Sequence, residues 1–203
     1  MKEQCVKGPH ISTGDMLRHH IERQDEIGRQ IRDMMKSGLL APDELVNQLV
    51  ADRIKALDCA EGFILDGYPR TLNQAAVLRR LTDENGIDAA VVHLVVDYER
   101  LVARLSGRRQ CPVCGTLYNL STNPPKVDEK CDLDGATLIT REDDRESVIL
   151  ERLSQYELQT RPLLDYFHSS GVPMFEIKGA GVPPEAIAKD ICEKLSGQGR
   201  AVR

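Results

Sequence analysis

The segment GFILDGYPRT, residues 62–71, has a short apolar run that ends in an acid, a glycine and a proline. It predicts a buried strand followed by a tight turn. Three further runs predict strands, at residues 9–12, 89–97 and 172–177. The run at 89–97, AAVVHLVVD, is nearly continuous in apolar residues, which is typical of a strand covered on both faces. Helical patterns lie between the strands, at residues 43–57, 144–156 and 184–195, so the chain is predicted to adopt an α/β fold with a parallel sheet.

The overall composition is that of a globular protein with a sizeable core. The chain has 203 residues, of which 41% are hydrophobic and 29% charged, and its formal net charge is -5. An acidic balance argues against nucleic-acid binding by general electrostatics, because phosphate backbones attract basic faces. No apolar stretch approaches the roughly 18 residues of a membrane span. The first ten residues, MKEQCVKGPH, contain no apolar core of the kind found in export signals.

Residues 110–140 interrupt the alternation of strands and helices. This segment is rich in Cys, Pro, Asn, Asp and Gly and has no helical periodicity, so it predicts a small inserted lobe. We expect a lid domain at residues 107–144 and a core domain formed by residues 1–106 and 145–203.

The lobe contains two short clips with the spacing of metal ligands. Cys111 and Cys114 form C-x2-C, and after a gap of sixteen residues Cys131 and Asp134 form C-x2-D. Two such clips at a hairpin-length separation are the layout of a structural zinc ribbon, and zinc accepts a carboxylate as its fourth ligand. Asp132 is an alternative fourth ligand, although the spacing favours Asp134. A disulfide or a cluster without metal is the competing interpretation.

Several segments together resemble the adenylate kinase family over nearly the whole chain. They are ISTGDMLR at 11–18, SGLLAPDE at 37–44, GFILDGYPRT at 62–71 with Gln74 beyond it, 104–109, Tyr118, NPP at 123–125 and REDD at 141–144. The lid resembles that of the zinc-bearing bacterial members. The resemblance implies a P-loop-type three-layer fold with sheet order 2-3-1-4-5 and an inserted zinc-ribbon lid. It also implies reversible phosphoryl transfer from ATP to AMP giving two ADP, with structural zinc, magnesium bound with ATP, and a cytoplasmic monomer.

The resemblance assigns site residues position by position, with an AMP-binding insertion at 12–41. The residues that would bind AMP are Thr13, Arg18, Leu39, Leu40, Ala41, Gly67, Tyr68, Pro69, Arg70, Gln74, Arg141 and Arg152. Those that would contact ATP are Arg104, Leu117, Tyr118 and Gly181. The catalytic residues would be Arg70, Arg108, Arg141 and Arg152, and the metal ligands Cys111, Cys114, Cys131 and Asp134.

These residue types suit the implied chemistry. Phosphoryl transfer asks a protein mainly to position two nucleotides and to neutralise charge, and guanidinium groups grip phosphate oxygens with paired hydrogen bonds. By resemblance, Asp66 would act on the magnesium shell through water. Asp143 and Asp144 would orient Arg108, Arg141 and Arg152 and would hinge the lid. Two residues have competing structural roles, since Ser12 and Thr13 also fit a helix N-terminus. Packing is likewise the favoured role of Tyr68.

The chain departs from the family pattern before Ile11. Family members there have a strand and G-x-P-G-x-G-K-G-T, whereas no G-x-x-x-x-G-K-[ST] occurs anywhere in the 203 residues. We therefore expect little or no kinase activity from this chain, because the loop's amides and lysine would cradle the phosphates. The implied sheet would lack its central strand. Two strands would then stand about 9–10 Å apart, with a gap, a collapse of the two halves or marginal stability as the result.

Four interpretations remain open from the sequence. The chain is an enzyme given in truncated form or from a wrongly chosen start codon, which we favour, or it is a catalytically inactive zinc-bearing AMP-binding pseudoenzyme. A zinc-ribbon nucleic-acid module is disfavoured by the acidic balance and by an aromatic content of 4%. A pyrimidine monophosphate kinase is disfavoured by the long lid and Gln74.

Overall fold

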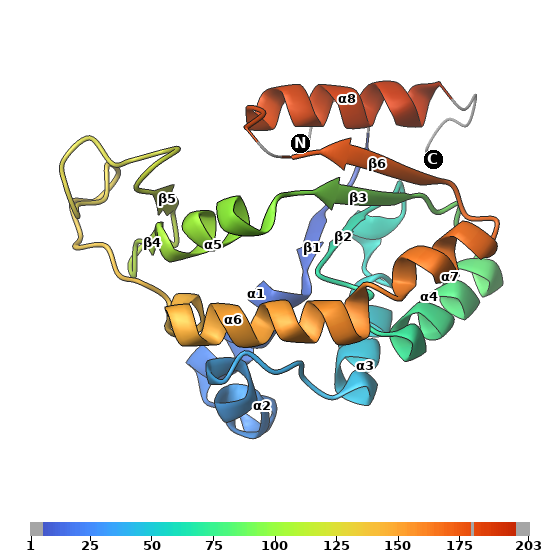
Figure 1. The fold of residues 1–203 in the computed structure, drawn as a ribbon. Coiled ribbons are helices and arrows are strands. Elements are labelled where there is room, and N and C mark those ends of the chain that lie inside the picture. The colour runs from blue at the N-terminus through green and yellow to red at the C-terminus, as the bar shows by residue number, and fades with distance from the viewer. Residues whose placement is uncertain (1–5, 180, 198–203) are drawn as a thin grey trace.

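The computed structural model describes residues 6–179 and 181–197. Within them, four core strands form two parallel pairs (Figure 1). The first pair joins β1 (His10–Ser12) to β2 (Ile64–Asp66), and the second joins β3 (Val91–Val95) to β6 (Met174–Lys178). The predicted α/β fold with parallel strands is confirmed, and each of the four predicted strands is present.

The pairing matches the implied sheet order on either side of its centre. If β1, β2, β3 and β6 are strands 2, 3, 4 and 5 of that order, the ladders 2-3 and 4-5 are both present. In the described residues no ladder joins β2 to β3, so the two pairs are separate sheets.

One prediction about the strands is wrong. Residues 89–97 were expected to be covered on both faces, but Leu94 is 47% exposed and Val95 is 41% exposed. The helix α8 (Pro184–Ser196) packs against β6, above the sheet in Figure 1, and leaves the carboxyl end of β3 uncovered. An apolar run shows that a strand can be buried, not that another element covers it.

The helices after β1 and β2 build the largest core cluster. They are α1 (Thr13–Arg23), α2 (Glu26–Lys36), α3 (Asp43–Arg53), the short η1 (Leu57–Cys59) and α4 (Leu72–Glu84). Ile31 and Val50 are fully buried in this cluster, with Leu45 and Leu49 packed against it. The apolar face predicted for residues 43–57 is therefore buried, although the helix ends at Arg53.

The lid follows α5 (Tyr98–Ser106) and extends to one side of the molecule (Figure 1). It contains the antiparallel strands β4 (Arg108–Gln110) and β5 (Leu117–Asn119), and the short helix η2 (Glu142–Asp144) follows it. Its own buried cluster is small, consisting of Cys111, Tyr118, Cys131 and Leu138.

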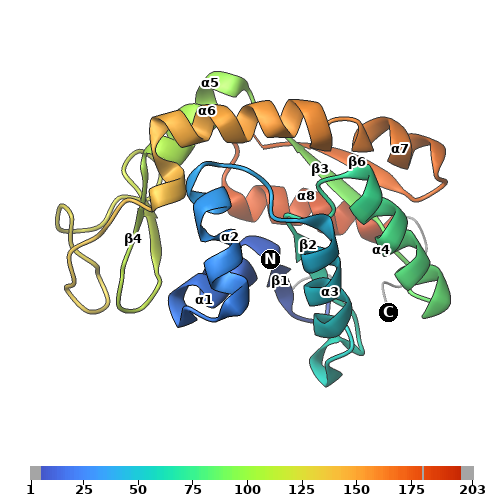
Figure 2. The same cartoon turned by 90° about the horizontal axis from the view of Figure 1, so that it is seen from below.

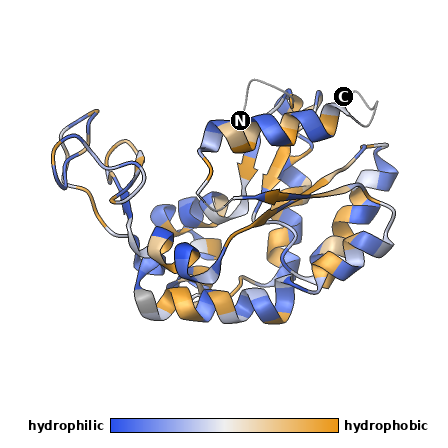
Figure 3. Cartoon of the chain, turned by 45° about the horizontal axis from the view of Figure 1, so that its top comes forward, coloured by the Kyte–Doolittle hydropathy of each residue, from blue (hydrophilic) through white to orange (hydrophobic). Residues whose placement is uncertain are grey.

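A long helical rod runs from the lid back to the core. It begins with α6 (Glu146–Gln155), continues as the π-helical turn η3 (Tyr156–Thr160) and is followed by α7 (Leu163–Ser169). Figure 2 shows the loop after α2 lying next to α6. Hydrophobic residues are concentrated on the strands and on the inner helix faces in Figure 3. None of the described helices is both long and apolar enough to cross a membrane.

Candidate active site and lid metal centre

A cavity lies where β1 and β2 end, between α1, the loop after α2, the β2–α4 loop and α6. It is lined by Thr13, Gly14, Leu17, Arg18, Met35, Gly38, Leu39, Leu40, Ala41, Val46, Gly67, Arg70, Gln74, Asp143 and Arg152. Nine of the twelve residues predicted to bind AMP are among them. Parallel sheets place their sites at the carboxyl ends of the strands, and this cavity obeys that rule.

Thr13 and Gly67 join the two strand ends beneath the cavity. The Thr13 hydroxyl donates to the Gly67 carbonyl over 3.0 Å, and Ser12 caps α1 by accepting from the Asp15 amide over 3.3 Å. Gly67 has φ +74°, and a Cβ there would lie 3.0 Å from Thr13 Oγ1. The structural roles anticipated for Ser12 and Thr13 are therefore real, and the close approach requires glycine.

The end of α2 turns the chain into the cavity. The Leu39 amide donates to the Met34 carbonyl and the Gly38 amide to the Met35 carbonyl, which is a Schellman end with Gly38 at φ +79°. A Cβ on Gly38 would lie 2.8 Å from the Val148 carbonyl of α6. Sequence analysis did not single out Gly38. A glycine directly after an amphipathic helix was the signal that could have found it.

Gln74 lies in the cavity wall with its amide already engaged. Its Oε1 accepts from the Arg70 backbone amide over 2.7 Å, and its Nε2 donates to Asp43 Oδ1 over 2.8 Å. Because an amide has two N–H groups and two lone pairs, one of each remains for a base. Asp43, at the start of α3, thus holds a residue of the candidate site.

Three residues predicted to bind AMP do not line the cavity. Tyr68 is buried in the core, where its hydroxyl donates to Asn47 Oδ1 over 2.7 Å and where burial raises its pKa to about 12. Pro69 follows it through a cis peptide bond. Arg141 lies at the end of the lid and donates from Nε to Oε1 of Gln110, a residue at the lid's start, over 2.6 Å. The packing role favoured for Tyr68 agrees with this position.

Arginines and two aspartates form a charged cluster beside the cavity. Arg108 donates to Asp144 over 3.1 Å, Arg18 reaches Asp143 at 3.4 Å, and Arg152 lies 3.6 Å from a carboxylate oxygen of each aspartate. The Asp144 side chain is fully buried, and this burial raises its pKa. The two aspartates therefore hold Arg18, Arg108 and Arg152 in place. Arg108 and Arg152 were expected to be held in this way, whereas Arg141 was also expected to be held but is not paired with either aspartate among the described residues.

Two further arginines of the cluster form no ion pair with a carboxylate in the part of the chain that the structure describes. Arg70 donates from Nε to the Gly67 carbonyl over 3.0 Å, and neither it nor Arg141 makes an ion pair with any described residue. Burial, and then the neighbouring charge of Arg152, lowers the pKa of Arg70. Burial, followed by the charge of Arg18, lowers that of Arg141. Arg18 also pairs with Asp15 over 2.5 Å. In the described part of the chain, five guanidinium groups thus face three carboxylates, those of Asp15, Asp143 and Asp144, an arrangement that a bound polyanion would stabilise.

The predicted metal ligands converge in the lid. One ligand atom from each of Cys111, Cys114, Cys131 and Asp134 lies within 4.8 Å of the others. Cys111 Sγ is 3.2 Å from Asp134 Oδ2, and Cys114 Sγ is 3.5 Å from Cys131 Sγ. Tetrahedral zinc with ordinary bond lengths would need about 3.8 Å between two sulfurs and about 3.5 Å between sulfur and oxygen. The donor set and its spacing fit zinc.

The backbone around the ligands has the form of two zinc knuckles. Gly115 and Gly135, at φ +74° and +72°, follow the two clips, as the turns require. The Ala136 amide donates to the Asp134 carboxylate. This hydrogen bond is the main reason why the pKa of Asp134 is lowered to about 2. The alternative ligand, Asp132, instead accepts from the Lys126 amide over 2.8 Å.

Comparison with known proteins identifies the chain's relatives. The family model described as adenylate kinase matches residues 2–172. The chain belongs to the adenylate kinase family. A protein of Caldanaerobacter subterraneus subsp. tengcongensis named adenylate kinase is 43% identical over 95% of this chain and 86% of its own length. An adenylate kinase of Thermosipho africanus is 44% identical over 90% and 85%, and one of Fervidobacterium nodosum is 46% identical over 84% and 78%. The family resemblance and the enzyme class, a phosphotransferase, are confirmed.

The four residues predicted to contact ATP lie away from the cavity at the ends of β1 and β2. Arg104 is exposed on α5, and Leu117 is 46% exposed on β5. Tyr118 is buried inside the lid, where its hydroxyl accepts from the Asp132 amide over 2.8 Å. Gly181 lies in the turn before α8 with φ +73°. None of these four lines the cavity described above.

Asp66, the acid that was expected to act on the magnesium shell, lies at the end of β2 with an accessible side chain. Asp66 ends β2, its side chain is 63% exposed, and its Oδ2 lies 3.1 Å from His10 Nε2. Adenylate kinases use magnesium with ATP, and Mg²⁺ keeps several waters while it binds one or two carboxylates and substrate phosphates. One accessible carboxylate at the strand end fits that requirement.

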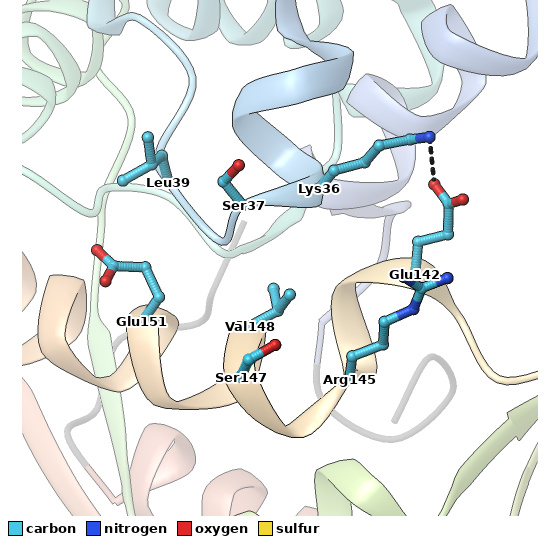
Figure 4. A pocket seen from close by; sticks show the side chains of 8 residues that line it. All are labelled: Lys36, Ser37, Leu39, Glu142, Arg145, Ser147, Val148 and Glu151. Atoms are coloured by element: carbon cyan, nitrogen blue, oxygen red, sulfur yellow. Dashed lines mark ion pairs between the residues drawn. The ribbon is translucent and has the colours of Figure 1, made fainter.

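A second, more open groove of about 680 Å³ lies between α2 and α6 (Figure 4). It is lined by Lys36, Ser37, Leu39, Glu142, Arg145, Ser147, Val148 and Glu151. Lys36 pairs with Glu142 over 2.9 Å, which ties the end of α2 to the segment that leaves the lid. Only Leu39 of this set was among the predicted site residues, so the groove adds no chemistry to the site.

Proposed function

We propose that this chain binds AMP in the cavity at the ends of β1 and β2 and holds its phosphate for transfer from ATP. The observation that carries the proposal is the cluster of five guanidinium groups around three carboxylates at the cavity edge. Phosphoryl groups are the polyanions for which such clusters are suited, because catalysis of their transfer is mainly positioning and charge neutralisation. A neutral or cationic ligand would leave the repulsion of Arg70 by Arg152, and that of Arg141 by Arg18, unrelieved.

The proposed roles follow from where the side chains lie. Arg18 and Arg70 bind the AMP phosphate, since both line the cavity. The backbone of 39–41 and the free amide hydrogen of Gln74 contact the adenine. Arg108, Arg141 and Arg152 bind the transferring phosphoryl group, with Arg108 and Arg141 at the two ends of the lid.

The lid has two proposed tasks. Residues 107–144 close over the nucleotides and exclude water, which would otherwise accept the phosphoryl group. Zinc bound by Cys111, Cys114, Cys131 and Asp134 stabilises the lid and takes no part in the chemistry. Magnesium bound with ATP would neutralise phosphate charge. The division into lid and core, the monomeric state and the cytoplasmic location stay predictions.

We further propose that the 203-residue chain, assayed as it stands, binds AMP but transfers phosphoryl groups slowly. It contains no G-x-x-x-x-G-K-[ST] segment, whose backbone amides and lysine would cradle the ATP phosphates. The same observation favours the alternative, a zinc-bearing AMP-binding protein without catalysis. The cluster of Arg108, Arg141 and Arg152 supports an enzyme, because AMP binding alone does not require it.

Titration calorimetry with AMP, combined with an assay of ADP formation from ATP and AMP, tests the proposal. Arg70→Met should weaken AMP binding by about 100-fold, because charge-assisted bonds to the phosphate are lost. Arg79→Met is the control, since Arg79 pairs with Asp83 on α4. Equal AMP affinity in all three proteins would refute the site. Turnover of the unmodified chain within the usual kinase range of about 1–100 per second would refute the proposed impairment.

Acceptor specificity separates the adenylate reading from a pyrimidine monophosphate kinase. Titration of CMP and UMP in place of AMP should show clearly weaker binding, because the remaining hydrogen-bonding groups of Gln74 would not match a pyrimidine. Equal affinity for the three nucleotides would contradict the assignment of Gln74 to adenine.

A further inference from the structure

Arg70 is fixed through its backbone rather than through a salt bridge. Its amide donates to Gln74 Oε1 over 2.7 Å, and its carbonyl accepts from the Thr160 hydroxyl over 2.9 Å. Among the described residues, the guanidinium itself makes one hydrogen bond, to the Gly67 carbonyl. Most of its donors therefore stay available to a ligand, while two side chains determine where the residue stands.

Thr160 reaches Arg70 from the same helical rod that carries Arg152. Thr160 follows Arg152 by eight positions. In an uninterrupted α-helix, the side chains of Arg152 and Thr160 would point about 80° apart around the helix axis. The rod instead contains the π turn η3, closed by the Arg161 amide donating to the Tyr156 carbonyl over 2.8 Å. A π turn has more residues per turn than an α-helix, so each residue rotates less about the helix axis. Thr160 therefore lies closer to the helix face that carries Arg152.

This tether acts against a repulsion. Arg70 and Arg152 both line the cavity, and after burial the charge of Arg152 is the next cause that lowers the pKa of Arg70. Two cations that must grip one phosphate would move apart when the ligand is absent. A hydrogen bond from the rod of Arg152 to the backbone of Arg70 opposes that movement.

We propose that Thr160 is a positioning residue that holds Arg70 at the spacing from Arg152 that a phosphate of AMP requires. The inference deepens the proposed function and rests on it. Thr160 touches no substrate itself. Its hydroxyl orients Arg70, so removal of the hydroxyl should affect only the binding of the phosphate end of the ligand.

The test compares AMP with adenosine, which has the same base and sugar but no phosphate. Thr160→Val keeps the shape of the side chain and removes the hydroxyl, and it should weaken AMP binding by about 3- to 10-fold. Adenosine binding should change by less than about 2-fold, because Arg70 contacts only the phosphate. Thr160→Ser restores the hydroxyl and should recover the AMP affinity.

Thr82→Val is the matched control. Thr82 is a buried threonine whose hydroxyl, like that of Thr160, donates to a backbone carbonyl, that of Arg79, over 2.9 Å. It lies on α4 and outside the cavity, so its variant should bind AMP like the unmodified chain. The midpoint of thermal unfolding, measured for every variant, confirms that each protein is folded.

The outcomes separate the inference from the function on which it rests. Equal losses of AMP and adenosine binding in Thr160→Val, no loss of AMP binding, or failure of Thr160→Ser to restore it would each overturn the positioning role while AMP binding itself stands. Failure of the unmodified chain to bind AMP would overturn both.

Discussion

The lid metal cluster and the arginine cluster are built in opposite ways. The metal ligands Cys111 and Asp134 are 23 residues apart in the chain, and every ligand sits in one of two short turns. Arg18 and Asp143, in contrast, are 125 residues apart, and their neighbours come from several helices and loops. The first cluster is encoded by spacing within a segment, whereas the second exists only when the core has folded.

The two clusters share one physical property. Each would be stabilised by a ligand of one charge: the lid offers three thiols and a carboxylate to a cation, and the core offers more guanidiniums than carboxylates to an anion. They differ in what else holds them. The lid has a buried cluster of only four residues, two of which are the ligands Cys111 and Cys131, while the arginines rest on the larger core around Ile31 and Val50. Loss of the metal should therefore unfold the lid without displacing Arg18, Arg70 and Arg152, which lie outside it.

The largest expected effect is that of removing the metal. Cys131→Ser, or a strong chelator, should lower bound zinc from about one ion per chain to less than about 0.1, because structural sites need all four ligands. The lid should then become sensitive to limited proteolysis within residues 110–140, while AMP binding in the core persists. Zinc content by elemental analysis and mass spectrometry of the fragments measure both effects.

Cys59→Ser is the control for this experiment, since Cys59 is a buried free thiol outside the cluster. It should keep its zinc. An unmodified protein without zinc, or a lid that stays protected after the metal is removed, would contradict the assignment.

The second effect tests the other cluster through its buried anion. Asp144→Asn should lower the free energy of unfolding by about 3 kcal/mol, because Arg108 and Arg152 would lose a buried partner and remain close to other cations. AMP should recover part of the loss by supplying negative charge. Chemical denaturation with and without AMP measures the effect.

The exposed pair of Asp97 and Arg100, 3.8 Å apart, provides the comparison. Asp97→Asn should change stability by less than about 0.5 kcal/mol. Equal effects at the two positions would mean that burial of Asp144 has no energetic consequence.

Features set by local spacing could be predicted from the sequence. The four strands, the apolar face of α3 and the convergence of the metal ligands all follow from patterns within a few residues to some twenty residues. The glycines after each clip fixed the turns, since the backbone needs a positive φ there. These predictions required no knowledge of how distant segments pack.

Features set by packing could not be predicted. Tyr118 was expected near ATP, but the small lid needs its ring for a core. Gln74 was expected to read a base, and its side chain also accepts a hydrogen bond from the Arg70 amide and donates one to Asp43. The arginine positions came from a family resemblance rather than from periodicity, and the role of Thr160 became visible only when its contact with Arg70 was known.

The smallest effect concerns a local contact outside both clusters. Asp25 caps α2 by accepting from the Gly28 amide over 2.9 Å and lies 2.7 Å from His20. The Gly28 hydrogen bond, followed by that of His20, lowers the pKa of Asp25 below its ordinary value of 3.8. A lowered acid pKa gives stability that is present above about pH 3.8 and is lost as the pH falls through the lower, folded-state pKa.

Asp25→Ala should therefore lower the unfolding midpoint by about 2–4 °C at pH 7 and flatten the loss of stability below about pH 4. Asp33→Ala, at a position of the same helix whose side chain is 85% exposed, should do neither. Thermal unfolding between pH 2.5 and 7 measures the slope. If the cap of α2 depends only on residues within its own segment, neither variant should change the zinc content or the AMP affinity. A loss of either in Asp25→Ala would mean that the cap of α2 is coupled to a distant cluster, so that the separation between the two kinds of site is incomplete.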